Sequence, residues 1–138
     1  MKKKILAISV GRSDYDRFKP ILSKLDESNK IKLYLYLTKA HQDPKFGNTE
    51  SFINKNFNVI KKKFKKIEFK KDISYGFSND LVYLTKKIEI LKPDIIIVLG
   101  DRYEMLLGPV AATPKNIPII HFYGGAVTEG AIDELVRH

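Results

Sequence analysis

The sequence predicts an α/β fold, a Rossmann-like parallel sheet with helices on both faces. Short apolar runs alternate along the chain with segments whose apolar residues recur at helical spacing. The run at 95–99 is almost purely β-branched, which is typical of a strand buried on both faces of a parallel sheet. Strands that alternate with helices form parallel sheets with right-handed crossovers. With 138 residues, 43% of them hydrophobic, the chain fits one domain over residues 1–138.

The first half of the chain is expected to alternate between strands and helices. The expected elements are a strand at 4–10, a helix at 15–28, a strand at 31–37, a loop at 39–49, a helix at 50–63, a short strand at 67–69 and a loop at 70–77. The first helix is predicted by the spacing of Phe18, Ile21 and Leu25. Pro20 falls in the first turns of that helix, where proline is tolerated.

The second half shows a sharper alternation. The expected elements are a helix from about Ser78 to Leu91, a strand at 95–99, a helix at 102–112, a strand at 117–122 and a last helix beginning near Gly130. Ser78 is the expected N-cap of the first of these helices, because a serine hydroxyl accepts a hydrogen bond from a free amide of the first turn. Pro93 is expected to stop that helix, since the residue before a proline disfavours the helical conformation.

Composition excludes several classes of protein. There are no cysteines, so disulfide scaffolds, cysteine nucleophiles and thiolate metal sites are excluded. No apolar run approaches the roughly 18–20 residues that span a bilayer. The basic start at 1–10 resembles a signal peptide, but its apolar stretch is only about six residues long and no small-residue cleavage site follows. A cytoplasmic protein without membrane attachment is the simplest interpretation.

The net charge of +9 is unevenly distributed. Residues 1–71 carry +12 and residues 72–138 carry −3, and much of the excess lies at 60–71, which has seven lysines and one glutamate. Such a run indicates either a site for nucleic acid or an acidic membrane, or a solvated surface. The solvated surface is the preferred interpretation, because the run has no arginine and only Phe64 and Phe69 as aromatic platforms. We therefore expect no nucleic-acid partner.

Three polar segments follow predicted strands and are expected to meet at one edge of the sheet. They are 11–17, 100–104 and 121–130, all rich in glycine, charged residues or histidine. Ligands of open parallel sheets bind outside the carboxyl ends of the strands. The chemistry of the chain is therefore predicted to converge at that edge.

The first polar segment, Gly11-Arg12-Ser13-Asp14, is a candidate anion site. It lacks the GxGxxG pattern of dinucleotide-binding folds. Glycine lets a ligand approach the backbone closely, and the following helix N-terminus favours an anion. Arg12 adds a guanidinium fork suited to phosphate. The alternative is that Ser13 or Asp14 simply caps the helix.

Asp101 follows the most buried of the predicted strands, in Gly100-Asp101-Arg102. An aspartate in this position is a candidate general base, because it stands above the carboxyl edge of the sheet. It is equally a candidate partner of Arg102 or Arg12, or a cap of the helix that follows.

The tail carries the densest group of polar residues, namely Thr128, Glu129, Asp133, Glu134, Arg137 and His138. Helical spacing places Asp133 beside Arg137, and Glu134 beside His138. These carboxylates are candidates either for acid–base chemistry or for the ordinary ion pairs of a surface helix. The three histidines of the chain lack a ligand spacing, so no metal site is expected.

Four motifs stand in order along the chain: GRSDYD at 11–16, HQDPKFGNT at 41–49, VLGDRYE at 98–104 and HFYGGAVTEGAIDELVRH at 121–138. Together they resemble the N-terminal half of the UDP-N-acetylglucosamine 2-epimerase family. The resemblance is to its hydrolysing branch, which feeds sialic acid and related nonulosonic acids.

The resemblance implies a glycosyltransferase-B-like architecture, in which two Rossmann-like domains enclose the active site. It implies conversion of UDP-N-acetylglucosamine and water to N-acetylmannosamine and UDP. In this scheme a base removes the C2 proton while UDP departs from C1. Water then adds to the resulting 2-acetamidoglucal, with protonation at C2 from the other face. No cofactor and no metal are implied.

The resemblance also assigns roles to residues of the matched motifs. Asp101 matches a carboxylate of acid–base catalysis, and Asp133 matches a second active-site carboxylate with Arg137 beside it. Arg12 matches an arginine that approaches the nucleotide phosphates. Tyr123 stands where many members have glutamate, and some hydrolysing relatives histidine, and is the candidate for the second proton transfer. The residues expected to bind substrate are Arg12, Ser13, Asp14, His41, Arg102, Gly124, Gly125, Thr128, Glu129, Glu134 and Arg137.

The resemblance covers the N-terminal half of the family, and the chain stops inside the last motif. We therefore expect little or no turnover by the isolated chain, since the family's C-terminal domain supplies most contacts to uridine and diphosphate. The expected partner is a second copy of the chain or a separately encoded C-terminal half. The alternative functions are epimerisation of a UDP-diacetamido sugar on the route to legionaminic acid, and a non-catalytic module that binds a nucleotide sugar.

Overall fold

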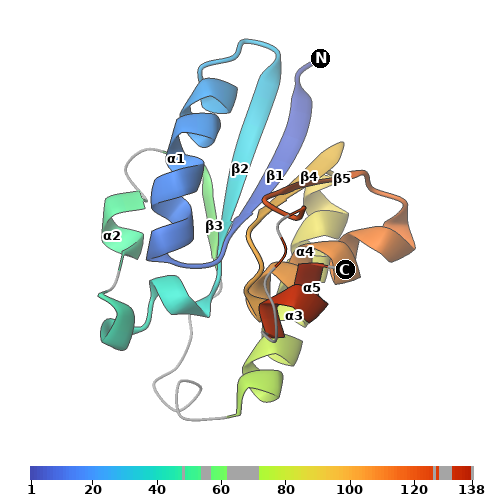
Figure 1. The fold of residues 1–138 in the computed structure, drawn as a ribbon. Helices are drawn as coiled ribbons and strands as arrows, with labels where there is room; N and C mark the ends of the chain where they lie inside the picture. Colours follow the sequence, from blue (N-terminus) through green and yellow to red (C-terminus); the bar gives the residue numbers. More distant parts are fainter. Residues whose placement is uncertain (48, 54–56, 62–71, 126, 128–131, 138) are drawn as a thin grey trace.

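The computed structural model describes residues 1–47, 49–53, 57–61, 72–125, 127 and 132–137. One sheet of five parallel strands runs in the order β3-β2-β1-β4-β5 (Figure 1). The strands are β1 (Lys3–Ser9), β2 (Ile31–Leu37), β3 (Val59–Lys61), β4 (Ile95–Leu99) and β5 (Ile119–Phe122). The predicted Rossmann-like parallel sheet is therefore confirmed.

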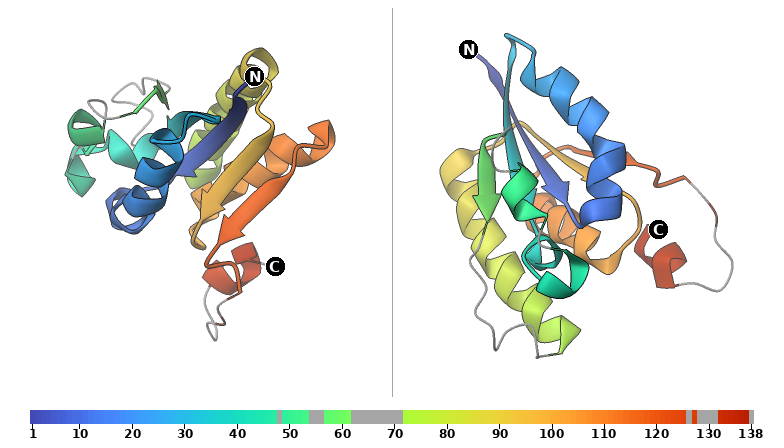
Figure 2. Two further views of the ribbon diagram at one scale, coloured as in Figure 1. Left: turned by 90° about the horizontal axis from the view of Figure 1, so that it is seen from above. Right: turned by 90° about the vertical axis from the view of Figure 1, so that its left-hand side faces the viewer.

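Helices connect the strands and cover both faces of the sheet. They are α1 (Arg12–Asp26), α2 (Glu50–Ile53), α3 (Ile73–Leu91), α4 (Leu107–Ala112) and α5 (Ile132–Arg137), with 3-10 turns η1 (Lys39–His41), η2 (Pro44–Phe46), η4 (Tyr103–Leu106) and η5 (Thr113–Lys115). α1 covers one face, whereas α3 and α4 cover the other (Figure 2). No described helix is long and apolar enough to cross a membrane.

The central strands divide their side chains between two cores, because successive residues of a strand point to opposite faces. Leu6 and Ile8 of β1 pack against α3 and α4, whereas Ile5 and Ala7 pack against α1. The residues of β4 alternate in the same way. β4 is thus buried on both faces, as the β-branched composition of 95–99 predicted.

Four predicted strands are confirmed within one or two residues. β2 and β4 have the predicted bounds, and β1 is shifted by one residue toward the N-terminus. β5 begins at Ile119 instead of residue 117. The carbonyl of Pro118 accepts a hydrogen bond from the Ile96 amide at 2.9 Å, but proline has no N–H to donate, so the regular ladder starts after it.

The helix predicted at 50–63 is wrong over residues 59–61. α2 spans Glu50–Ile53, whereas residues 59–61 form β3, an edge strand that pairs in parallel with β2. The β-branched pair Val59 and Ile60 suits a strand better than a helix. The strand predicted at 67–69 and nearly all of the lysine-rich run lie outside the described residues.

The helix starts also differ from the predictions. α3 begins at Ile73, because the Asp72 carboxylate caps it by accepting a hydrogen bond from the Ser74 amide at 2.6 Å. The predicted N-cap, Ser78, lies inside this helix, and part of the predicted loop at 70–77 is helical. α1 begins at Arg12, three residues before the predicted start. The helix predicted at 102–112 begins as η4 and continues as α4.

Candidate active site

The turn after β4 places Asp101 at the carboxyl edge of the sheet. Gly100 adopts a φ of 81°, a conformation that glycine reaches without strain. The Gly100 amide donates to the Phe122 carbonyl at 3.0 Å, and His121 Nε2 donates to the Gly100 carbonyl at 2.6 Å. Both bonds come from β5, so the neighbouring strand holds the backbone from which Asp101 projects.

Arg137 brings α5 onto this turn. Its Nη2 donates to Asp101 Oδ2, and its Nη1 donates to Glu134 Oε2 at 3.1 Å. The Arg137 side chain is 6% exposed, whereas the Asp101 side chain keeps 29% of its surface open. Figure 2 shows α5 beyond the ends of β4 and β5. The last helix therefore fixes the carboxylate without covering it.

Asp101 pairs with Arg137, and not with Arg102 or Arg12, the two candidates named from the sequence. Arg102 forms its ion pair with Glu104, at 3.2 and 3.4 Å. Asp133 lies in α5, but its side chain is outside the described part of the chain, as are Thr128, Glu129 and His138.

The loop after β1 contributes exposed polar groups to the same edge. Gly11 is the N-cap of α1 and no side chain caps this helix, so capping by Ser13 or Asp14 is wrong. Arg12 and Ser13 are exposed and line a cavity of about 410 Å³, to which Arg102 also contributes. Two guanidinium groups at one cavity suit an anionic ligand.

Asp14 follows Ser13 in α1 but does not line this cavity. Burial raises the pKa of its carboxyl group, although the neighbouring Arg102 guanidinium opposes the rise. Its Oδ2 atom is buried and has no hydrogen-bond partner among the described residues. A side chain at position 100 would place its Cβ 3.7 Å from Asp14 Oδ1, so this carboxyl group packs against the β4 turn.

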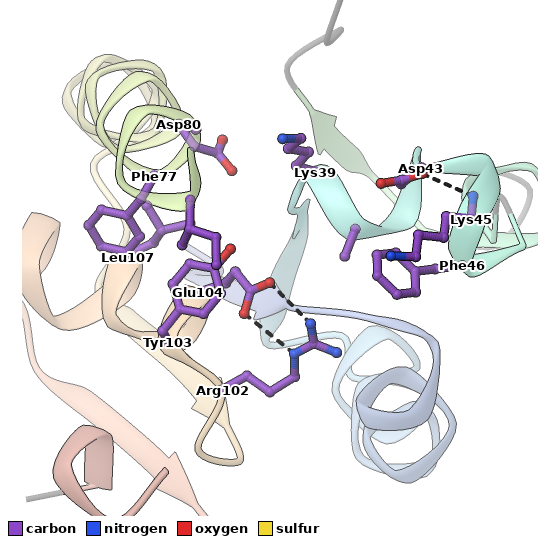
Figure 3. A pocket seen from close by; sticks show the side chains of 13 residues that line it. Lys39, Asp43, Lys45, Phe46, Phe77, Asp80, Arg102, Tyr103, Glu104 and Leu107 are labelled. Atoms are coloured by element: carbon purple, nitrogen blue, oxygen red, sulfur yellow. Dashed lines mark hydrogen bonds and ion pairs between the residues drawn. The ribbon is translucent and has the colours of Figure 1, made fainter. Parts of the chain in front are cut away.

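A second cavity, of about 350 Å³, opens between η2, α3 and η4 (Figure 3). Ala40, Phe46 and Arg102 line both cavities, so the two are neighbours. Asp80, on α3, is 3% exposed and accepts a hydrogen bond from the Tyr36 hydroxyl. Burial raises the pKa of Asp80 to about 7.

Glu104 lines this second cavity on the same side as Asp80 (Figure 3). Its side chain is 12% exposed and is paired with Arg102. Burial, together with the Glu104 carboxylate, raises the pKa of Tyr103 to about 12, so the Tyr103 hydroxyl keeps its proton at neutral pH.

His41 is fully buried and lines neither cavity. Its Nε2 hydrogen-bonds to Ser9 Oγ at 2.9 Å, and its Nδ1 hydrogen-bonds to Thr49 Oγ1 at 2.7 Å. Burial lowers the pKa of His41 to about 4, so the ring is neutral. The residue expected to bind substrate thus links the end of β1 to the loop that carries η1 and η2.

The turn after β5 presents Tyr123 to solvent. Tyr123 has a φ of 63°, a left-handed conformation that bulky residues rarely adopt, and it is 62% exposed. A Cβ on Gly124 would lie 2.8 Å from Cγ and Cε1 of the His121 ring, whereas one on Gly125 would meet nothing within 4 Å. Gly124 is therefore required by the close approach of His121.

The carboxyl edge brings together most of the residues singled out in the sequence. Arg12, Ser13, Asp14, Asp101, Arg102, Glu134, Arg137, Tyr123, Gly124 and Gly125 all lie on elements that meet there. Asp80, Tyr36 and His121 were not among the predicted site residues. Asp80 lies on the buried side of a helix whose spacing would otherwise be purely apolar, and that single polar residue is the signal that could have identified it.

Comparison with known proteins gives consistent matches. The family described as UDP-N-acetylglucosamine 2-epimerase matches residues 23–138. The GDP/UDP-N,N'-diacetylbacillosamine 2-epimerase (hydrolyzing) of Campylobacter jejuni is 34% identical over 143 residues, which cover 99% of this chain and 36% of that protein. The UDP-N,N'-diacetylbacillosamine 2-epimerase (hydrolyzing) of Legionella pneumophila is 32% identical, over 100% of this chain and 37% of that protein. The chain thus spans little more than a third of these relatives and matches their N-terminal portion.

A solved structure has the same fold. The crystal structure of UDP-GlcNAc 2-epimerase from Neisseria meningitidis bound to UDP-GlcNAc superposes with a TM-score of 0.78 at 20% identity. The match covers 97% of this chain and 37% of that one. At this identity the likeness shows the fold alone, and it confirms the expected domain type of a glycosyltransferase-B-like architecture.

Proposed function

Because this chain belongs to the UDP-N-acetylglucosamine 2-epimerase family, we propose that it forms the N-terminal side of the active site of a hydrolysing UDP-sugar 2-epimerase. The proposed reaction converts UDP-N-acetylglucosamine and water to N-acetylmannosamine and UDP. A base takes the C2 proton as UDP leaves C1, and the glucal that forms then gains water and a proton at C2 from the opposite face.

The observation that carries this proposal is the placement of Asp101. Its carboxylate stands at the carboxyl edge of the sheet, partly open and held by Arg137. A general base must be fixed in position and still reach the proton that it removes. Asp101 meets both conditions and takes the acid–base role, whereas Arg137 acts as a positioning residue.

The remaining roles follow from the cavity beside the α1 N-terminus. Arg12 and Arg102 place two guanidinium groups at a cavity of about 410 Å³, which suits the diphosphate of a UDP-sugar. Tyr123 projects from the neighbouring β5 turn, and its hydroxyl is the proposed donor of the proton to the opposite face of C2. Asp133 stays the proposed second carboxylate, because α5 carries it next to Glu134.

The other side of the cleft is proposed to come from the portion of the relatives that this chain does not match. The matched region is 36% of the Campylobacter jejuni relative. A separately encoded C-terminal half is one proposed source of that portion, and a second copy of the chain is the other proposed partner. The 138-residue chain alone is then expected to bind UDP-sugars weakly and to turn them over slowly.

A second substrate is favoured by the names of the two relatives. Both the Campylobacter jejuni and the Legionella pneumophila proteins are named for UDP-N,N'-diacetylbacillosamine, a sugar with two N-acetyl groups. A UDP-diacetamido sugar is therefore the second candidate for the same reaction at the same site.

Incubation of the chain with each UDP-sugar, followed by detection of free UDP, tests the proposal. Slow UDP release that Asp101→Asn abolishes is the expected result. UDP release at the rate of a full-length relative would contradict the half-cleft argument. Release that Asp101→Asn leaves unchanged would contradict the role of Asp101.

A further inference from the structure

The cavity between η2, α3 and η4 has a size suited to part of a small ligand. Its volume is about 350 Å³, and small-molecule sites fall in the range of roughly 300–1,000 Å³. It shares Arg102 and Phe46 with the cavity proposed to hold the diphosphate. A UDP-sugar with its diphosphate at Arg12 and Arg102 would extend the far side of its sugar ring into this second cavity.

One part of this cavity is apolar. The Phe46 ring is 50% exposed on one side, and Phe77 and Leu107 lie on the other side (Figure 3). The Phe77 ring packs 6.3 Å from the Tyr103 ring. The half-exposed Phe46 ring offers an apolar surface suited to a methyl group of a ligand, whereas Phe77 and Leu107 pack against the core on the other side of the cavity.

The other part is polar and nearly closed to water. Asp80 is 3% exposed and Glu104 is 9% exposed, and both line the cavity. Tyr36 donates one hydrogen bond to Asp80, and Arg102 donates to Glu104. Each carboxyl group has several acceptor sites, so both retain the capacity to accept a further hydrogen bond from a ligand.

An acetamido group matches these two parts. Its methyl group suits the Phe46 surface, its amide N–H suits a carboxylate, and its carbonyl oxygen suits the guanidinium of Arg102. A sugar hydroxyl would satisfy the carboxylates but would leave the apolar part of the cavity unfilled. The cavity is therefore more complementary to an acetamido group than to a hydroxyl group.

We propose that this cavity binds the acetamido group that a UDP-diacetamido sugar carries farther from its diphosphate, and that it thereby selects this sugar over UDP-N-acetylglucosamine. The inference rests on the proposed function, since it takes the diphosphate to lie at Arg12 and Arg102, and it favours the second of the two substrates proposed there. It names Phe46 and Glu104 as specificity-determining residues.

Calorimetric titration of the chain with UDP, UDP-N-acetylglucosamine and UDP-N,N'-diacetylbacillosamine tests the inference. The diacetamido ligand is expected to bind about tenfold more tightly than UDP-N-acetylglucosamine, a factor typical of one extra group buried in a fitted pocket. Equal affinities for the two sugars, with UDP bound, would overturn the inference and leave the proposed function standing. No binding of any of the three ligands would overturn both.

Gly76→Leu locates the preference in the cavity. Gly76 lines the cavity on α3, and a Cβ there would meet only the Lys39 side chain, at 3.6 and 3.8 Å. Leucine also favours the helix over glycine. The variant is expected to keep its affinity for UDP and to lose the tenfold preference. The matched control, Ser78→Leu, adds the same side chain at an exposed position of α3 and is expected to retain it. Retention of the preference by Gly76→Leu would overturn the inference.

A direct contact measurement on the unaltered chain keeps the test independent of folding of the variants. Nuclear Overhauser effects are expected between an acetyl methyl group of UDP-N,N'-diacetylbacillosamine and the ring protons of Phe46. Glu104→Gln, which keeps the shape of the side chain, is expected to weaken this ligand more than UDP-N-acetylglucosamine. Absence of the ring contacts in the bound complex would overturn the inference.

Discussion

Arg137 in α5 is ion-paired with Asp101 in the β4 turn, across a separation of 36 residues. The pair joins the last helix to the strand that carries the proposed base. Replacement of Arg137 by glutamine is expected to lower the free energy of unfolding by about 2 kcal/mol, because a partly buried carboxylate loses a charged donor. Urea denaturation measures this change.

A double-mutant cycle with Asp101→Asn isolates the pair itself. The two substitutions are expected to be non-additive by at least about 0.5 kcal/mol, as is usual for residues in direct contact. Arg137→Gln is also expected to speed amide exchange over 132–137, since this pair tethers α5. Full additivity would mean that Arg137 stabilises the fold without acting on Asp101.

The His121 ring lies close to Gly124 at the same edge of the sheet. Gly124→Ala is expected to destabilise the protein by about 1–3 kcal/mol, because its Cβ would displace the ring and break the hydrogen bond to the Gly100 carbonyl. Thermal denaturation measures the loss. Gly125→Ala is the matched control and should have little effect, since a Cβ there meets nothing within 4 Å.

The buried His41 ring makes stability depend on pH. Its pKa in the folded protein is about 4, below the ordinary value of 6.5, because burial disfavours the charged ring. As pH falls from about 6.5 to about 4, the unfolded chain gains a proton that the folded protein does not, and stability falls by up to about 3 kcal/mol. Removal of this titration by His41→Gln is expected to eliminate that contribution, measured as unfolding free energy at pH 4.5 and pH 7.

Asp80 makes stability depend on pH in the opposite direction to His41. Burial raises its pKa in the folded protein to about 7, so stability falls as pH rises from about 4 to about 7, while only the unfolded chain loses the proton. Asp80→Asn keeps an acceptor for the Tyr36 hydroxyl and is expected to stabilise the protein by about 2–4 kcal/mol at pH 8 but not at pH 4. The exposed Asp26→Asn serves as control. A uniform effect of Asp80→Asn at both pH values would contradict the burial argument.

His41 and Asp80 change the stability in opposite directions over much of the same pH range. Removing one of the two groups therefore leaves the pH dependence of the other visible in the unfolding free energy. Stability is expected to rise with pH between about 4 and 6.5 in Asp80→Asn, and to fall over that range in His41→Gln. The unaltered chain should show a shallower dependence than either variant.

Buried strands were predictable because they depend on local composition. The β-branched run at 95–99 has one favourable environment, the interior of a parallel sheet, and the structure places it there. The segment at 59–61 was mistaken for helix because its pairing with β2 depends on a distant strand and not on local periodicity. The capping of α3 by Asp72 was missed because Ser78, another residue type that commonly caps helices, was taken as the N-cap.

The candidate site was also predictable only in part. Proximity of the loops after β1, β4 and β5 follows from the topology of a parallel sheet, so Arg12, Asp101 and Tyr123 could be assigned to one edge in advance. The ion-pair partner of Asp101 could not be predicted, because it depends on how α5 packs against the β4 turn. Arg102, one of the expected partners, instead pairs with Glu104.

Substitution of Arg12 tests directly whether the diphosphate binds beside the α1 N-terminus. Arg12 lines the cavity beside the α1 N-terminus, whereas Arg17, also exposed on the same helix, does not. Arg12→Gln is expected to weaken UDP binding by about tenfold, because one charge-assisted contact to phosphate is lost. A tenfold change corresponds to about 1.4 kcal/mol of binding free energy. Arg17→Gln removes the same charge and should leave the affinity within about twofold, because a long-range charge effect at an exposed position is largely screened. Equal weakening by both substitutions, seen in calorimetric titrations at physiological salt, would assign the effect to net charge and not to a phosphate site at Arg12.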